Sequence, residues 1–99
     1  MIGMMVRVRY LGPIRVMLNK KEEELVVPFK TTLIESLDKL ASLYGESFKD
    51  EVFESKSKTI REGLVITVNG IAVNQLGGLK ARLNEGDTIT LLPFFAGGG

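Results

Sequence analysis

The stretch TLIESLDKLASLYG, residues 32–45, decides the fold. Thr32 and Glu35 have the spacing of a capping box, in which the hydroxyl and the carboxylate satisfy free amides of the first helical turn. Gly45 supplies the positive-φ residue that commonly ends a helix. The apolar residues recur at helical spacing and form one stripe: Leu33, Leu37, Leu40, Ala41 and Tyr44. We therefore predict one substantial helix, whose apolar stripe must cover a sheet.

Residues 5–10, upstream of this helix, predict a first strand because apolar and charged side chains alternate along them. Val6, Val8 and Tyr10 fall on one face, and Arg7 and Arg9 fall on the other. Gly12-Pro13 breaks the strand. We expect a loop over residues 14–18 that packs Ile14, Val16 or Leu18 on the core.

Residues 22–29 predict a second strand, with Leu25, Val27 and Phe29 on one face. Pro28 cannot donate to a ladder, so we expect it near a strand end or on a sheet edge. Two successive strands favour an antiparallel hairpin. The acidic run at residues 22–24 is expected to be solvated, with a cation site as its alternative.

The chain after the helix is expected to supply the remaining strands. Residues 46–63 are irregular, with apolar residues spaced for one short helical turn, and residues 64–68 predict a central strand buried on both faces. Asn69-Gly70 is a strong hairpin signal. Residues 71–73 predict a short return strand, residues 75–81 a turn or 3₁₀-helix, and residues 88–92 the last strand.

The expected order is therefore β-β-α-β-β-β. It predicts an α+β domain over residues 1–92, with a mixed five-stranded sheet under one main helix, and a flexible C-terminal glycine tail over residues 93–99. The two strands that flank the helix are expected to be parallel neighbours. The sheet face away from the helix is expected to be either polar or an interaction surface.

Composition excludes several functional classes. The chain has 99 residues with 44% hydrophobic and 25% charged residues, which fits one soluble domain. It lacks cysteine and histidine, so disulfides, thiolate metal sites, a cysteine nucleophile and the commonest general base are excluded. The net charge of +1 disfavours direct nucleic-acid binding. We expect no bound metal, no membrane span and a cytoplasmic location.

The tail Pro93-Phe94-Phe95-Ala96-Gly97-Gly98-Gly99 is the candidate functional segment. Glycine lacks a Cβ, so such a segment can follow a narrow channel. The reactive group at this end is the terminal carboxylate of Gly99. The alternative interpretation is a frayed terminus without function. The three residues of the tail base, Pro93, Phe94 and Phe95, are candidates for partner binding, because aromatic anchors dominate interfaces.

The predicted order of elements, ending in this tail, resembles the β-grasp fold of ubiquitin-like proteins. The segments Gly86-Asp87, Leu92-Pro93 and Ala96-Gly97-Gly98 resemble the sulfur-carrier family, which includes the molybdopterin synthase small subunit and the thiamine-pathway sulfur carrier. Three further segments resemble the molybdopterin-synthase type: Tyr10-Leu11-Gly12-Pro13-Ile14-Arg15, Val68-Asn69-Gly70 and Leu76-Gly77-Gly78-Leu79. The chain departs from that family at Phe94 and Phe95, where a second proline and a valine are usual, and in its third glycine.

The resemblance implies a sulfur carrier whose C-terminal glycine, Gly99 or a trimmed Gly98, becomes an adenylate and then a thiocarboxylate. Ala96, Gly97 and Gly98 would thread into the partner. An E1-like enzyme would use ATP and magnesium for activation, since this chain has no GxxxxGK[ST] phosphate loop. A molybdopterin synthase large subunit would use the sulfur. A ubiquitin-like modifier joined to lysines, or a sulfur donor for tRNA thiolation, are the alternatives.

Overall fold

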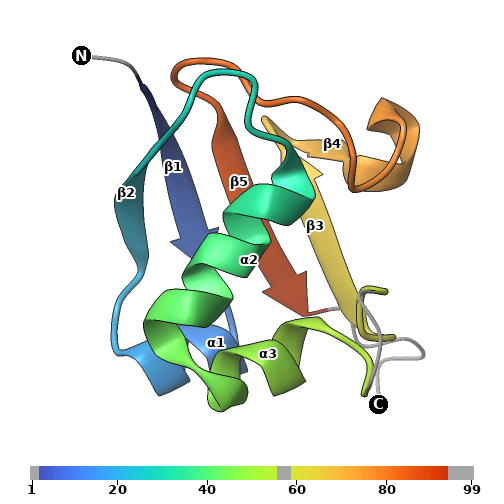
Figure 1. The fold of residues 1–99 in the computed structure, drawn as a ribbon. Helices are drawn as coiled ribbons and strands as arrows, with labels where there is room; N and C mark the ends of the chain where they lie inside the picture. Colours follow the sequence, from blue (N-terminus) through green and yellow to red (C-terminus); the bar gives the residue numbers. More distant parts are fainter. Residues whose placement is uncertain (1–2, 56–58, 94–99) are drawn as a thin grey trace.

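The computed structural model describes residues 3–55 and 59–93 (Figure 1). The strands are β1 (Met4–Tyr10), β2 (Glu22–Val27), β3 (Leu64–Val68), β4 (Ile71–Ala72) and β5 (Thr88–Pro93). The helices are α1 (Pro13–Leu18), α2 (Leu33–Tyr44) and α3 (Glu46–Val52), with a 3₁₀ turn η1 (Val73–Leu76). Within the described part of the chain, no helix combines the length and the apolar content that crossing a bilayer requires.

The five strands form one mixed sheet in the order β2-β1-β5-β3-β4. β1 pairs antiparallel with β2 and parallel with β5, and β5 pairs antiparallel with β3. This is the β-grasp arrangement, as predicted. The expectation of parallel neighbours on either side of the helix is wrong in one respect. β2 and β3 run in the same direction, but β1 and β5 lie between them, so the parallel contact is that of β1 with β5.

Helix α2 lies across one face of the sheet (Figure 1), as its apolar stripe predicts. Thr32 and Glu35 form the predicted capping box, and Gly45 ends the helix with φ 83°. Leu33, Leu37 and Leu40 are fully buried. They share the core with inward side chains of the three middle strands, among which the following are buried: Val6, Val8, Tyr10, Ile66, Ile89 and Leu91. Burial of these side chains is the main stabilising contribution to the fold.

The loop expected over residues 14–18 is instead the short helix α1. Pro13 stands at its first turn, where a fixed φ and a missing N–H cost nothing. Asn19 ends the helix in the left-handed region with φ 55°. Of the apolar residues expected to reach the core, Ile14 is buried, whereas Val16 is 80% exposed.

Strand β2 ends at Val27, two residues before the predicted end. The Thr31 amide donates to the Pro28 carbonyl at 3.2 Å, and Lys30 has φ 68°, so the chain turns there. Phe29 therefore does not share the inward face of Leu25 and Val27, and it is exposed. Pro28 directly follows the last residue of this edge strand, where a residue that cannot donate to a ladder is expected.

Strand β3 is present over the predicted residues but is buried on one face only. Ile66 and Val68 are buried under the helices, while Val65 and Thr67 on the other face are half-buried. The predicted hairpin at Asn69-Gly70 is confirmed, with φ 54° and 83°. The side-chain oxygen of Asn69 accepts from the Thr88 amide at 2.9 Å, which ties this turn to the start of β5.

Candidate functional site

Pro93 is the last described residue before the glycine tail, and it closes β5. It pairs with Leu64 at the start of β3, one register position beyond the pair Val65 and Leu92. Because strand side chains alternate, Pro93 and Leu64 point to the helix side of the sheet, and Leu92 points to the open side. Leu92 is 38% exposed. The other predicted site residues lie outside the described residues: Phe94, Phe95, Ala96, Gly97, Gly98 and Gly99.

Gly12 packs against the ring of Pro93. The backbone of Gly12 has φ 65°, and a Cβ built there would lie 2.4 Å from Pro93 Cγ. Leu11, next to it, donates its amide to the Leu91 carbonyl at 3.2 Å. The turn from β1 into α1 is therefore packed against the end of β5, and it fixes the place where the tail leaves the sheet.

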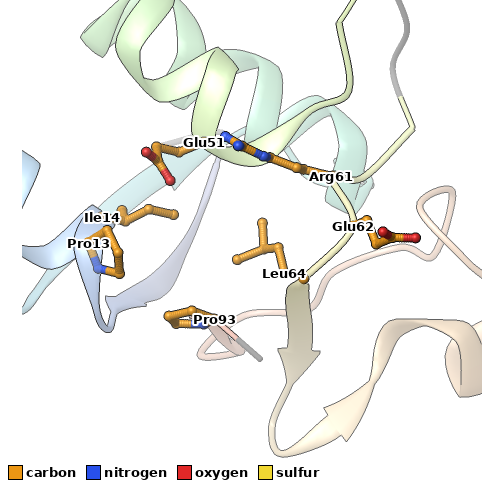
Figure 2. A pocket seen from close by; sticks show the side chains of 8 residues that line it. Pro13, Ile14, Glu51, Arg61, Glu62, Leu64 and Pro93 are labelled. Carbon is orange, nitrogen blue, oxygen red and sulfur yellow. The ribbon is translucent and has the colours of Figure 1, made fainter. Parts of the chain in front are cut away.

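A surface cavity of about 250 Å³ opens directly beside Pro93. Figure 2 shows Ile14 and Leu64 projecting toward each other across it, with Pro13 and Pro93 nearby and Glu51, Arg61 and Glu62 along its margin. The cavity thus combines residues of α1, α3, β3 and β5, which are distant in the sequence. It has an apolar floor, a charged margin, and the root of the tail as one wall.

The wall of the cavity that precedes β3 is fixed to helix α3. Arg61 donates its Nη1 to the Asp50 carbonyl at 2.7 Å and its backbone amide to the Val52 carbonyl at 2.8 Å. The Leu64 amide in turn donates to the Arg61 carbonyl at 3.1 Å. Phe48 and Val52 of α3 are fully buried, so α3 is itself anchored in the core. The cavity is therefore a preformed part of the fold.

The open face of the sheet carries a band of ion pairs on β1 and β2. Arg7 Nη1 lies 2.5 Å from Glu22 Oε2, and Arg7 Nη2 lies 3.5 Å from Glu24 Oε2. Arg9 Nε lies 3.9 Å from Glu22 Oε1. These side chains are about half exposed, so each pair contributes little stability. The face is largely polar over β1 and β2. Its apolar part is formed by Leu92 and Val65, next to Pro93, where the tail begins.

The acidic run at residues 22–24 is not a solvated turn, because Glu23 points inward from β2. Its side chain is 19% exposed. Glu23 Oε2 accepts hydrogen bonds of 2.5 Å from the hydroxyls of both Tyr10 and Tyr44. Lys20 Nζ lies 3.5 Å from Glu23 Oε1 and donates to the Tyr44 hydroxyl at 2.9 Å. This cluster joins the end of α2 to the strands beneath it.

The pKa values in this cluster shift as its geometry requires. Burial acts to raise the pKa of Glu23, but the hydrogen bonds from Tyr10 and Tyr44 outweigh it, so the pKa lies below its ordinary value. Burial, reinforced by the hydrogen bond to Glu23, raises the pKa of Tyr10 far above its usual range. The hydrogen bond to Tyr44 and the Glu23 charge raise the pKa of Lys20. Glu23 is thus a half-buried structural anion whose carboxylate is engaged by these hydrogen bonds.

The described residues offer binding surfaces but no catalytic constellation. Among residues 3–55 and 59–93, no three acidic side chains are grouped to hold a metal ion. The half-buried carboxylate of Glu23 and the buried carboxylate of Asp87 both accept hydrogen bonds from neighbouring residues. What the fold supplies is a rigid exit for the tail, with a cavity on one side of the sheet and Leu92 on the other.

The tail can be recognised in the sequence, but the cavity beside it cannot. The cavity is built by α1, α3 and β3 together, and local patterns carry no sign of such a juxtaposition. The inward side chain of Glu23 did have a signal. Leu25 and Val27 are predicted to share one face of the strand, and the two-residue period of a strand places Glu23 on that same face.

Comparison with known protein families identifies the family of this chain. A model of the ThiS family matches residues 8–98. A comparison with curated proteins gives no match.

Solved structures share the fold over nearly the whole chain. A chain of the Amycolatopsis orientalis BexX/CysO complex is 28% identical, covers 93% of this chain and 98% of that chain, and gives a TM-score of 0.72. A Pyrococcus furiosus protein that carries the provisional name molybdopterin converting factor, subunit 1, is 25% identical, with 93% and 99% covered and a TM-score of 0.73. The small archaeal modifier protein 1 of H. volcanii is 17% identical, with 94% and 100% covered and a TM-score of 0.80, and this likeness concerns the fold alone.

Proposed function

Because the chain belongs to the ThiS family of ubiquitin-like sulfur carriers, we propose that it carries sulfur as a thiocarboxylate on its C-terminal glycine. The observation that carries this proposal is the extent of the family match, which runs through Gly98 and so includes the Ala96-Gly97-Gly98 segment. Fold alone would not suffice, since one fold hosts many functions. The working residue is Gly99, or Gly98 if the last glycine is trimmed.

The proposed chemistry begins with a carboxylate, which is ionised at neutral pH and is a poor electrophile. One carboxylate oxygen attacks the α-phosphorus of ATP, pyrophosphate leaves, and an acyl-adenylate forms. A sulfide then attacks the acyl carbon. The new C–S bond replaces the C–O bond to AMP, and the product is a thiocarboxylate. An E1-like enzyme with ATP and magnesium performs these steps, and this chain contributes the positioned tail.

The finer assignment that we propose is the small subunit of a molybdopterin synthase. Two observations support it. The motifs around Gly12-Pro13 and Gly77-Gly78 resemble that branch of the family, and the Pyrococcus furiosus neighbour bears the corresponding name at 25% identity. A large subunit would then receive the tail and transfer its sulfur to a pterin precursor. Since activation consumes ATP, we place this function in the cytoplasm.

The tail base is proposed to contact these partners. Pro93, Phe94 and Phe95 follow directly from Leu92, an exposed apolar residue on the open face. An aromatic side chain next to an exposed apolar patch is the usual composition of an interface anchor. Ala96, Gly97 and Gly98 would then enter the partner's channel. Because β5 ends in a rigid exit, less chain must be ordered on binding.

The proposal is tested by the mass of the protein after incubation with its activating enzyme, ATP and sulfide. The expected product gains the mass of one oxygen-to-sulfur exchange, located on the final glycine by fragmentation. Adding the large subunit should then convert a pterin precursor to the dithiolene and return the tail to a carboxylate. A variant with one tryptophan added after Gly99 is the control, since a bulky end cannot pass a glycine-wide channel.

Other outcomes would identify the alternatives. Isopeptide adducts on lysines without any thiocarboxylate would support a protein modifier and overturn the sulfur-carrier proposal. A thiocarboxylate that serves tRNA thiolation or the thiamine pathway, and not the pterin, would keep the carrier function but overturn the molybdopterin assignment. Adenylation of the tryptophan-extended variant at the normal rate, without trimming, would contradict the channel argument.

A further inference from the structure

We propose that the side chain of Phe95 docks in the cavity beside Pro93, so that the protein's own tail base is anchored on the helix side of the sheet. Phe95 itself lies outside the described residues, but the cavity and the strand that leads to it are both described. The proposal does not depend on whether the C-terminal carboxylate carries sulfur.

The register of β5 directs Phe95 to this side. Leu91 and Pro93 point to the helix side, and Pro93 forms one wall of the cavity (Figure 2). If the backbone continues extended past Pro93, the two-residue period would bring Phe95 to this side and Phe94 to the open side beside Leu92. Phe95 comes two positions after Pro93, so an extended chain places it about 7 Å further along. No long loop needs to close for the ring to reach the cavity.

The size and chemistry of the cavity fit one aromatic ring. Its volume is about 250 Å³, and a cavity of about 150 Å³ already accommodates benzene. Ile14 and Leu64 supply apolar contacts on opposite sides. Arg61 borders the cavity, and its guanidinium is held in place by the Asp50 carbonyl. A fixed guanidinium next to an aromatic ring is favourable.

The rigid walls also favour a fixed occupant. Gly12 lies against Pro93 on one side, and Arg61 ties the opposite wall to α3. An occupant therefore finds a preformed site and need not order it. With Phe95 held, residues 96–99 would project from a defined point, and Phe94 would be the aromatic residue of the tail base that is left to contact a partner.

The first test is nuclear magnetic resonance on the full chain with methyl-labelled isoleucine and leucine. We expect nuclear Overhauser effects from an aromatic ring to the methyl groups of Ile14 and Leu64 that vanish in Phe95→Ala. Phe94→Ala is the matched control and should retain them. The proposal is overturned if these signals vanish in Phe94→Ala instead, or if neither variant loses any.

The second test is chymotrypsin cleavage after Phe95, measured by intact mass in the Phe94→Ala background. The protein should be cut about tenfold more slowly than a synthetic peptide of residues 91–99 with the same substitution, since burying one aromatic ring gives at least this protection. Adding Leu64→Phe, which fills the cavity from its own wall, should restore the peptide rate. Equal rates in protein and peptide, or slow cleavage that Leu64→Phe leaves unchanged, would overturn the proposal.

Discussion

Gly12 and Pro93 are in contact where the tail leaves the sheet, and the contact leaves no room for a side chain at Gly12. A Cβ there would lie 2.4 Å from Pro93 Cγ and 3.2 Å from Pro93 Cδ, and the residue has φ 65°. Glycine is therefore required for two reasons: the positive φ favours it, and the ring of Pro93 leaves no room for a Cβ. A residue in the turn after β1 thus controls the position of the last described residue of β5.

Gly12→Ala should lower the free energy of unfolding and displace the tail root. The backbone strain costs about 1–3 kcal/mol, and the steric clash with the proline ring adds about 1 kcal/mol or more. Gly45→Ala is the matched control. Gly45 has φ 83° and ψ −159°, close to the φ 65° and ψ −142° of Gly12, but nothing lies within 4 Å of its added Cβ. Urea unfolding of both variants separates strain from contact, and equal losses would show that the contact with Pro93 carries no energy.

The parts of the fold that local patterns determine were predictable. The capping box and the apolar stripe of α2 are both confirmed, because each depends on residues within one or two turns. The same holds for the turn at Asn69-Gly70. Strand order was not predictable in this way. The parallel contact of β1 with β5 joins residues about 80 positions apart, and its choice depends on how the whole core packs.

The candidate site shows the same division. The glycine tail is visible in the sequence because its composition is unusual, whereas the cavity beside it depends on four separate segments. Helix α1 was missed because six residues are too few to show a helical period. Its end signals, Pro13 at the first turn and Asn19 after the last, are residue types that are equally common in loops.

Glu23→Gln should remove stability at neutral pH and have less effect in acid. The pKa of Glu23 is lowered in the folded protein from an ordinary value of 4.5. Its contribution is therefore present above about pH 4.5 and is lost as the pH falls through the lower folded pKa. We expect a loss of about 1.5–3 kcal/mol at neutral pH, because two hydrogen bonds to a charged group are weakened.

Urea unfolding at about pH 7 and about pH 3 checks this dependence. The difference between wild type and Glu23→Gln should shrink in acid. Glu24→Gln is the control on the same strand, since that side chain is 58% exposed and lies 3.5 Å from Arg7. It should change stability by less than about 1 kcal/mol at either pH. If the loss of unfolding free energy in Glu23→Gln is the same at both pH values, the charge of Glu23 does not contribute to stability.

Ser36→Ala should stabilise the protein. Ser36 is fully buried on α2, and its Oγ has no hydrogen-bond partner among the described residues. Alanine removes this unsatisfied group and has a higher helix propensity, so we expect a gain of about 1 kcal/mol in the free energy of unfolding. Ser42→Ala, at an exposed position of the same helix, reports the propensity effect alone. If both substitutions give the same gain, the Ser36 hydroxyl is satisfied in solution.

Leu92→Glu should slow activation of the tail while leaving the fold intact. Leu92 is 38% exposed on the open face and directly precedes Pro93. If a partner covers this face when it receives the tail, the new carboxylate is desolvated there, and we expect a loss of about tenfold or more in kcat/KM for adenylation. Ile71→Glu is the matched control, because Ile71 is 45% exposed but pairs with Val68 at the opposite end of β3. Steady-state pyrophosphate release measures both variants. An equal effect of the two substitutions would indicate a general charge effect, and an unchanged rate for Leu92→Glu would place the interface away from the open face.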